Sequence, residues 1–413
     1  MASTLVTNIK LLVNTRFENK LLRGKELSVL PCVENAFLLI EDGFIASFGE
    51  MINLGPVDEV ADNIIDASGQ MVLPCWCDSH THLVFAASRE EEFVDKIRGL
   101  SYAEIAARGG GILNSARKLN AMSESELLRL AWARLNEVMQ MGTGAIEIKS
   151  GYGLSVEGEL KMLRVIKRLK ETSPIPVKAT FLGAHTYPPE FKENHQGYIE
   201  LLIKEMLPVI AEEELADYID VFCETGFFSP GETEQICRAG MSYGLKPKIH
   251  ANQLNLSGGT QTGVKLGAVS VDHLETMDED AIQQLAASQT IGTLLPTAAF
   301  FLRMPFQPAR QLIDGGCAIA LATDFNPGSS PSGNMNLVVS MSCIQMKMLP
   351  EEAINAATIN GAFAMELQDE VGSINIGKKA NLIFTRPVPS LAYLPYSFGT
   401  NPIDRVMIEG EWL

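Results

Sequence analysis

The residues best suited to chemistry in this chain are two histidines separated by one residue, His80 and His82. They follow an apolar run, Met71-Val72-Leu73-Pro74, which predicts a buried strand over residues 71–79. Because alternate residues of an extended chain point the same way, both imidazoles are expected to aim at one point. Two converging imidazoles suit Zn²⁺ or iron. A His-x-His pair by itself is equally compatible with two histidines that only pack in a core.

Further candidate groups stand where other predicted strands end. Five of the six histidines occupy such positions, namely His80, His82, His185, His250 and His273. The sixth, His195, lies in a charged segment, where we expect a surface side chain. Asp324 ends the last predicted strand. We therefore predict one divalent metal per chain, Zn²⁺ or Fe²⁺/Fe³⁺, held by His80, His82, His250 and Asp324.

A metal of this kind activates water. The reaction then needs neighbouring groups that accept the water proton and stabilise the substrate. Asp324 can bind the metal through one oxygen and take the proton of the water with the other. His273 is expected to donate a hydrogen bond to a substrate oxygen as negative charge builds there. An alternative for His273 is that it only supports a metal ligand.

Eight strand-like segments alternate with helical patterns in the middle of the chain. Strands are predicted near residues 71–79, 144–149, 177–184, 218–223, 246–250, 269–273, 290–295 and 317–323. Helices are predicted near residues 123–141, 155–172, 196–211, 231–243, 257–266, 278–287, 308–315 and 333–347. This alternation predicts a parallel (β/α)₈ barrel, whose active site lies at the carboxyl ends of the strands. A doubly wound open sheet is the second possibility, but the sequence has no G-x-G-x-x-G motif, and Gly109-Gly110-Gly111 indicates a loop.

Short strand patterns without long helices occupy both ends of the chain. Near the N-terminus, Ala36 to Ile40 and Phe44 to Phe48 are joined by a predicted hairpin turn at Glu41-Asp42-Gly43. Residues 380–384 and 405–408 have the same pattern near the C-terminus. We predict that residues 1–70 and 374–413 form one small β-sandwich domain, and that residues 71–373 form the barrel.

The composition excludes several classes of function. A net charge of −17 argues against binding to a phosphate backbone. The seven cysteines form no C-x-x-C pair, so neither a disulfide framework nor a zinc knuckle is expected, and several are expected to be buried thiols. The first residues have no basic segment followed by an apolar one, and no apolar run is long enough to cross a membrane. We expect a cytoplasmic protein.

Several longer motifs resemble a known family. They are His80-Thr81-His82-Leu83-Val84-Phe85 with Ser88-Arg89, Lys149-Ser150-Gly151-Tyr152-Gly153-Leu154, Phe181-Leu182-Gly183-Ala184-His185, and Leu321-Ala322-Thr323-Asp324-Phe325-Asn326-Pro327-Gly328-Ser329-Ser330. The ligand pattern resembles the amidohydrolase superfamily, and these motifs resemble the imidazolonepropionase family within it. The resemblance covers essentially the whole chain, and the last motif is the most specific.

The resemblance implies hydrolysis of 4-imidazolone-5-propionate to N-formimidoyl-L-glutamate, the third step of L-histidine degradation. Asp324, His273 and His185 are the catalytic residues that it implies. The substrate pocket would be lined by Arg89, Tyr152, His185, Gln253, Asn326, Gly328 and Ser329. Arg89 can hold the propionate with two parallel hydrogen bonds, or it can be an ordinary surface partner of Glu90-Glu91-Glu92. Tyr152 can donate a hydroxyl hydrogen bond, or it can be a packed loop aromatic.

Two features of this sequence limit which properties of the family can be transferred to it. Gln253 stands where the family has Glu or Gln, and because a Gln cannot act as a base, Asp324 must carry the proton. Two-metal relatives often have a modified Lys at the end of strand 4, whereas this strand ends with Cys223-Glu224. We therefore predict one metal, with Lys149 and Glu224 as the residues that could accommodate a second.

Other functions remain open at this point. Another cyclic-amide hydrolase or a nucleobase deaminase would share the barrel and the metal, but a neutral base has no carboxylate for Arg89 to hold. A scaffold protein derived from an enzyme would be expected to lose metal ligands, and this chain retains all of them. We expect a small anionic substrate, no nucleic-acid or membrane partner, and a homodimer.

Overall fold

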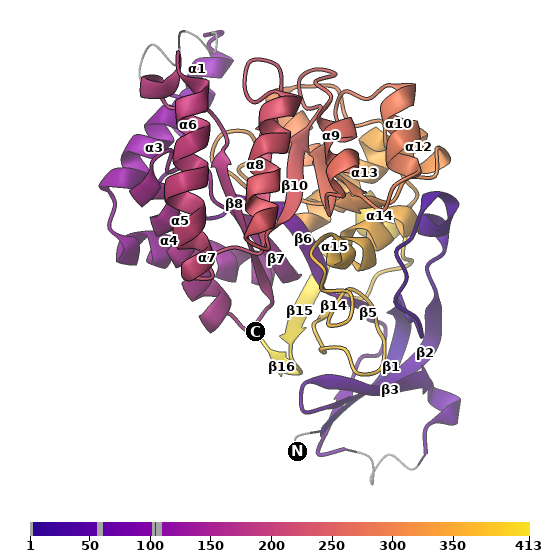
Figure 1. Ribbon diagram of the computed structural model, residues 1–413. Coiled ribbons are helices and arrows are strands. Elements are labelled where there is room, and N and C mark those ends of the chain that lie inside the picture. The colour runs from indigo at the N-terminus through magenta and orange to yellow at the C-terminus, as the bar shows by residue number, and fades with distance from the viewer. Residues whose placement is uncertain (1–2, 56–60, 101–103, 105–109) are drawn as a thin grey trace.

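The computed structural model describes residues 3–55, 61–100, 104 and 110–413, and it contains a barrel and a smaller β-domain (Figure 1). The barrel strands are parallel and lie side by side in chain order. They are β6 Trp76–Thr81, β7 Thr143–Lys149, β8 Val177–Ala184, β9 Tyr218–Cys223, β10 Lys246–Ala251, β11 Ser270–His273, β12 Ile291–Leu294 and β13 Ile319–Leu321. The predicted (β/α)₈ fold is therefore confirmed.

The first and last barrel strands meet just beyond their ends. Thr81 and Phe325 form a parallel bridge. The amide of Asp324 donates to the carbonyl of His80 at 2.9 Å, and the amide of His82 donates to the carbonyl of Phe325 at the same distance. Deeper in this seam, the Asp78 carboxylate accepts hydrogen bonds from the amide and hydroxyl of Thr323. These contacts close the barrel and exclude the open doubly wound sheet.

Helices surround the barrel, and those predicted from the sequence are present. They are α4 Glu124–Gln140, α5 Val156–Thr172, α6 His195–Leu201 continued by a π-helical turn at Leu202–Met206 and by α7 Leu207–Glu212, α8 Pro230–Ser242, α9 Gly259–Leu266, α10 Glu279–Ala286, α12 Ala309–Asp314 and α13 Met335–Met346. Six further helices were not predicted: α1 Glu90–Ile97, α3 Ile112–Ala121, α11 Pro296–Leu302, α14 Pro350–Ala357, α15 Ile359–Ala364 and α16 Tyr393–Tyr396. Among the described residues, 3₁₀ turns lie at Gly24–Ser28, Met51–Asn53 and Pro189–Phe191.

The smaller domain is built by both ends of the chain around its own apolar cluster, as predicted. Its strands are β1 Ser3–Val13, β2 Cys32–Glu41, β3 Phe44–Glu50, β4 Asn63–Asp66, β5 Met71–Pro74, β14 Leu382–Thr385, β15 Ile403–Ile408 and β16 Glu411–Trp412. The hairpin between β2 and β3 turns at Asp42 and Gly43, whose φ angles of 49° and 84° are those of a tight two-residue turn. The residue bounds 1–70, 71–373 and 374–413 stay a prediction.

The strand predicted over residues 71–79 is in fact two strands in different sheets. β5 pairs with β1 and β14 of the smaller domain, whereas β6 pairs with β7 of the barrel. The change occurs where Cys75 donates to the carbonyl of Asn381 and Trp76 donates to that of Gly142. Pro74 has no backbone donor, which helps the chain leave the first sheet at this point. An apolar run that continues through both strands does not show, from the sequence, that the chain passes from one sheet to another.

Several smaller expectations can also be compared with the structure. Cys75, Cys77, Cys223, Cys237 and Cys317 are buried free thiols, as expected, while Cys32 is exposed. Of the glycine-rich loop, Gly109 lies outside the described residues, and Gly111 precedes α3. In the part of the chain that the structure describes, no helix has the length and apolar character needed to cross a bilayer.

Candidate metal centre and active site

Three imidazoles and one carboxylate converge at the carboxyl end of the barrel: His80 lies on β6 and His82 follows it, His250 lies on β10, and Asp324 follows β13. Ring atoms of His80, His82 and His250 lie within 4.8 Å of one another. The Asp324 Oδ1 atom lies 3.5 Å from His80 Nε2 and 3.6 Å from His82 Nε2. The structure therefore brings the four predicted ligands together. All four are buried, with at most 2% of each residue exposed.

Two of the imidazoles are oriented from behind by carboxylates. His80 Nδ1 lies 2.6 Å from Asp272 Oδ2, and His250 Nδ1 lies 2.9 Å from Asp220 Oδ2. Because a carboxylate accepts the Nδ1 proton, each ring presents the Nε2 lone pair to the centre of the cluster, which is the usual arrangement around metal-ligating histidines. Burial keeps the pKa of His80 well below its ordinary value, and the nearby Lys149 ammonium adds to this effect. The His80 ring is therefore suited to bind as a neutral ligand.

The donor set fits a divalent transition metal. The Nε2 atom of His80 is buried and has no hydrogen-bond partner among the described residues. Two ligand atoms bound to one zinc ion in tetrahedral geometry lie about 3.4 Å apart, close to the distances from Asp324 to His80 and His82. Three neutral nitrogens and one carboxylate also match the ligand types that zinc and iron accept. The cluster is thus a metal site by geometry as well as by composition.

The loop after β13 carries Asp324 and is held by Asn326. The Asn326 side chain donates to the backbone carbonyl of Asp324 at 2.6 Å and accepts from the amides of Gly328 and Ser329 at 2.8 Å each. The Ser329 hydroxyl lies 3.2 Å from Asp324 Oδ2. Asp324 itself has a positive φ of 54°. Burial raises the pKa of Asp324 to about 6, near the range in which a carboxylate can accept and return a proton.

The two remaining histidines of the site differ in their surroundings. His185 Nδ1 lies 3.0 Å from the carbonyl of Gly151, so it carries the proton and leaves Nε2 as an acceptor. Burial, with the neighbouring His250, lowers the pKa of His185 to about 3. His273 Nδ1 lies 3.3 Å from Glu275 Oε1. Burial lowers the pKa of His273, but the Glu275 carboxylate outweighs burial and raises it above the ordinary value, which makes this ring a donor.

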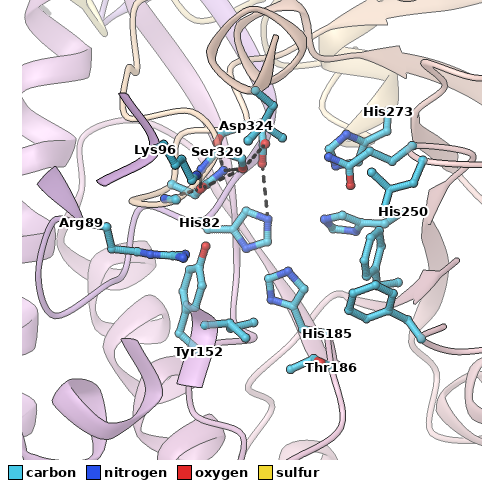
Figure 2. A pocket seen from close by; sticks show the side chains of 18 residues that line it. His82, Arg89, Lys96, Tyr152, His185, Thr186, His250, His273, Asp324 and Ser329 are labelled. Carbon is cyan, nitrogen blue, oxygen red and sulfur yellow. Dashed lines mark hydrogen bonds and ion pairs between the residues drawn. The ribbon is translucent and has the colours of Figure 1, made fainter. Parts of the chain in front are cut away.

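A cavity of about 480 Å³ opens in front of the metal ligands (Figure 2). In this view Arg89 lies on one side, and His250 and His273 lie on the other. All seven predicted substrate contacts line the cavity: Arg89, Tyr152, His185, Gln253, Asn326, Gly328 and Ser329. Apolar side chains complete the wall, among them Ile112, Phe222, Phe227 and Leu302. A cavity with one polar and one apolar part suits a small polar ring with a charged tail.

The sequence left two roles open for Arg89, a partner of the neighbouring glutamates or a group that faces the substrate, and the structure shows features of both. Its Nε and Nη2 atoms donate to Glu92 Oε2 at 2.8 and 2.7 Å, so the ion pair with the acidic run exists. The side chain is nevertheless only 12% exposed and faces the cavity. Its Nη1 atom lies against Gly328, where an added Cβ would be 2.2 Å away. Glu92 therefore fixes one edge of the guanidinium group and leaves another edge for an anionic ligand.

Several residues of the site were missed by sequence reasoning. Lys96 is a second cation in the cavity wall, on the same helix α1 that begins after Arg89. Asp220, Asp272 and Glu275 orient histidines. Sequence reasoning assigned no role to Asp220 or Asp272 because their partners are distant in sequence, and it gave no role to Glu275 although its partner His273 is only two residues away. Glu224, considered for a second metal, instead accepts from the amides of Leu254 and Asn255 in a neighbouring loop. His195 is a partly exposed surface residue, as predicted, although it starts α6 and is not in a loop.

Comparison with known proteins gives one consistent family. A family model described as the amidohydrolase family matches residues 229–413. The chain is 58% identical over 409 residues to an imidazolonepropionase of Flavobacterium johnsoniae, with 99% of each chain covered. It is 56% identical over 408 residues to an imidazolonepropionase of Christiangramia forsetii, covering 98% of this chain and 99% of the relative. A third imidazolonepropionase, from Parabacteroides distasonis, is 42% identical over 400 residues.

Solved structures with little sequence similarity share the fold. A guanine deaminase of E. coli superposes with a TM-score of 0.74 at 15% identity, covering 100% of this chain and 99% of that one. A triazine hydrolase variant also superposes with a TM-score of 0.74, at 16% identity, covering 100% and 94%. Because identity is so low, these likenesses establish the architecture and leave the substrate to the residues of the site.

Proposed function

The chain belongs to the imidazolonepropionase family of the amidohydrolases, and we propose that it hydrolyses the cyclic amide C–N bond of 4-imidazolone-5-propionate to give N-formimidoyl-L-glutamate, a step of L-histidine degradation. The observation that carries this proposal is a single cavity with metal ligands at one end and Arg89 at the other. The volume of the cavity, about 480 Å³, accommodates a small ring joined to a carboxylate tail. The nearly full-length relatives support the same activity.

His80, His82, His250 and Asp324 would hold one divalent metal, either zinc or iron. Such an ion lowers the pKa of a water molecule to roughly 7 and polarises a carbonyl oxygen. The low pKa values of the buried His80 and His82 imidazoles keep these two rings neutral, and therefore available as ligands, at the pH of the cytoplasm in which we place the enzyme. We also propose that two copies of the protein form a homodimer.

Arg89 would bind the propionate through the edge of its guanidinium group that Glu92 leaves available. Lys96, on the same side of the cavity, adds positive charge for an anionic substrate. Burial lowers the pKa of Lys96, and the Arg89 cation lowers it further, so an incoming carboxylate would relieve repulsion between two neighbouring cations. Tyr152 is 4% exposed and lies between Arg89 and His185, where its hydroxyl can donate to the substrate (Figure 2).

The proton path would run through Asp324. One water adds across the amide C–N bond: its oxygen joins the carbonyl carbon, and its proton reaches the departing ring nitrogen. Asp324 would accept that proton and return it to the nitrogen. His273, held by Glu275, would donate to the carbonyl oxygen as charge builds there. His185 would accept a hydrogen bond from a ring N–H through its free Nε2 atom.

Gln253 and the loop after β13 would position the substrate. Gln253 lines the cavity but has no titratable group, so its contribution is hydrogen bonding. Asn326 already uses its side chain inside its own loop. Its contribution would therefore be to place Gly328 and Ser329, whose backbone and hydroxyl groups face the cavity.

The test is a metal analysis of the purified protein together with an absorbance assay for loss of the imidazolone ring. We expect about one metal per chain and hydrolysis of imidazolone propionate. Arg89→Ala should lose a charge-assisted contact of roughly 1.5–3 kcal/mol, which corresponds to an increase in KM of about ten-fold or more. Arg89→Lys should recover only part of the loss, because a point charge replaces a planar fork.

A neutral nucleobase is the informative control substrate. Turnover of guanine in place of imidazolone propionate would refute the proposed substrate and indicate a deaminase on the same scaffold. If Arg89→Ala keeps kcat/KM for imidazolone propionate within about two-fold of the wild type, carboxylate recognition lies elsewhere in the cavity.

A further inference from the structure

The barrel interior beneath the metal site contains a group of charged side chains to which the reaction assigns no role. Glu147 and Lys149 lie on β7, Asp220 on β9, Lys248 on β10 and Asp272 on β11, and each is at most 1% exposed. Burying charges is costly unless they are paired, so each of these groups needs a partner that the fold supplies. Two of the five, Asp220 and Asp272, also orient metal ligands.

Lys149 connects those two carboxylates. Its Nζ atom lies 2.8 Å from Asp220 Oδ2 and 3.5 Å from Asp272 Oδ2. These are the same oxygen atoms that contact His250 Nδ1 and His80 Nδ1. Glu147 Oε1, at 2.7 Å, anchors the ammonium from the opposite side. Burial alone would lower the pKa of Lys149, but Asp220, Glu147 and Asp272 outweigh burial and raise it, which keeps the side chain charged.

We propose that Lys149 is a positioning residue that holds Asp220 and Asp272 where they orient His250 and His80, so that the histidine ligands are arranged before the metal binds. Without a cation between them, two buried carboxylates would repel each other and turn away from their imidazoles. The rings would then lose the hydrogen bonds that direct Nε2 inward. The inference deepens the proposed function, since it concerns the same site, but metal binding alone tests it.

The arrangement also answers whether Lys149 is a ligand for a second metal. All the contacts of its ammonium group described above are with carboxylates behind the histidines. A lysine engaged in this way orients the site from below and does not enter it. The same chemistry explains why a cation is required at this position, because only a cation can pair with several anions at once.

The test compares Lys149→Met with Lys248→Met, a matched control. Lys248 is also fully buried in the barrel and pairs with the other oxygen of Glu147. Its remaining contacts are the carbonyls of Ser79 and Ala364 at 3.2 and 3.1 Å. Both variants remove a buried cation, but only Lys149→Met removes the contact with Asp220 and Asp272.

Zinc affinity of the purified chain would be measured by competition with a chromogenic chelator, and thermal unfolding of the metal-free variants would be recorded in parallel. We expect Lys149→Met to weaken zinc binding by about 10–100-fold, the usual cost of losing a group that supports a ligand, and Lys248→Met to weaken it by less than about three-fold. Lys149→Arg, which retains the charge, should bind zinc more tightly than Lys149→Met. Equal weakening in the Lys149→Met and Lys248→Met variants, or an unchanged affinity in Lys149→Met, would overturn the proposal.

A measurement on the wild type keeps the proposal testable if Lys149→Met does not fold. In metal-free protein labelled with ¹⁵N-histidine, the rings of His80 and His250 should each be fixed with the proton on Nδ1. Averaging between tautomers would show that the ligands are not arranged in advance and would overturn the inference. If zinc binding behaves as expected but imidazolone propionate is not hydrolysed, the proposed function fails while the role of Lys149 stands.

Discussion

Asp324 can be tested as metal ligand and proton carrier by a single substitution. Asp324→Asn keeps an oxygen that can bind a metal but removes the group that accepts a proton. We expect kcat to fall by roughly 10²–10⁴-fold, the usual contribution of general acid–base catalysis. The measurement is kcat at matched metal occupancy, so that loss of metal is not mistaken for loss of the base.

Gln253 provides the comparison for this experiment, because it lines the same cavity without a titratable group. Gln253→Ala should lower kcat far less than Asp324→Asn, and Gln253→Glu should be tolerated, because the two side chains have the same length and shape. An Asp324→Asn enzyme with nearly normal kcat would refute this proton path and identify His273 or His185 as the base.

The metal ligands could be predicted from the sequence, whereas the groups that orient them were not. His80 and His82 alternate on an extended strand, and that spacing is visible in the chain itself. Asp220 and Asp272 act on His250 and His80 across neighbouring or distant strands, which a linear sequence does not show. The sequence does contain one indication of these groups: Glu147 and Lys149 lie two positions apart in a strand that is otherwise mostly apolar. Polar residues at alternate positions of a buried strand indicate a polar barrel interior.

Among the structural elements, the loop after β13 depends on a glycine for steric reasons. A Cβ on Gly328 would lie 2.2 Å from Arg89 Nη1 and 3.0 Å from its Cζ. Gly328→Ala should therefore displace the guanidinium group and raise KM for imidazolone propionate by about ten-fold, comparable to loss of a charge-assisted contact. The metal content should change little, because Gly328 is not itself a proposed metal ligand.

Gly231→Ala is the matched control for this substitution. Gly231 lies in α8, and a Cβ there would meet nothing within 4 Å. We expect its KM to equal that of the wild type. If Gly328→Ala gives normal kinetics as well, Arg89 can move without losing the substrate, and its observed position is not required for binding.

The turn before β14 contains a buried lysine that makes stability depend on pH. Lys378 is 1% exposed, and burial lowers its pKa from 10.5 to about 8. Between pH 8 and 10.5 the unfolded chain therefore binds more protons at this residue than the folded chain, so its contribution to the free energy of unfolding rises with pH. Relative to Lys378→Met, the wild type should gain on the order of 3 kcal/mol across this window.

Chemical denaturation of both proteins at several pH values from 7 to about 10.5 measures this difference. Lys25→Met, at an exposed lysine in the first 3₁₀ turn, is the control and should show no trend relative to the wild type. A difference between wild type and Lys378→Met that stays constant from pH 8 upward would contradict the assignment.

At the level of elements, periodicity predicted the barrel units well and the sheet boundaries less well. Apolar runs separated by helical patterns located all eight barrel strands, because each strand is buried on both faces. Short helices such as α14, with eight residues, and α15, with six, were missed because they are too short to show a period. Burial of a single side chain is not visible in such patterns: Lys378, which follows Gly377 in a turn, is 1% exposed.

For the whole molecule, metal binding and stability should be linked. A ligand that binds only the folded chain stabilises it by about 2.7 kcal/mol at a free concentration one hundred times its Kd. Zinc should therefore raise the thermal unfolding temperature of the metal-free protein by several degrees. A chelator should reverse the shift, and His80→Ala should abolish both the shift and activity.

The double variant His80→Ala/His250→Ala gives the stricter result. It removes two of the three histidine ligands, so we expect no bound metal and no thermal response to zinc. Full metal content in that variant, measured by elemental analysis, would disprove the assignment of the site.

The barrel seam that brings Asp324 to His80 and His82 also sets an order of events during synthesis. Thr323, the partner of Asp78 in this seam, follows it by 245 residues. At a ribosomal rate of about 5–20 residues per second, roughly 12–50 seconds separate the two halves of the seam. During that interval the growing chain presents its first histidines without the aspartate that completes the metal site. The complete set of four proposed metal ligands therefore exists only after residue 324 has been synthesised.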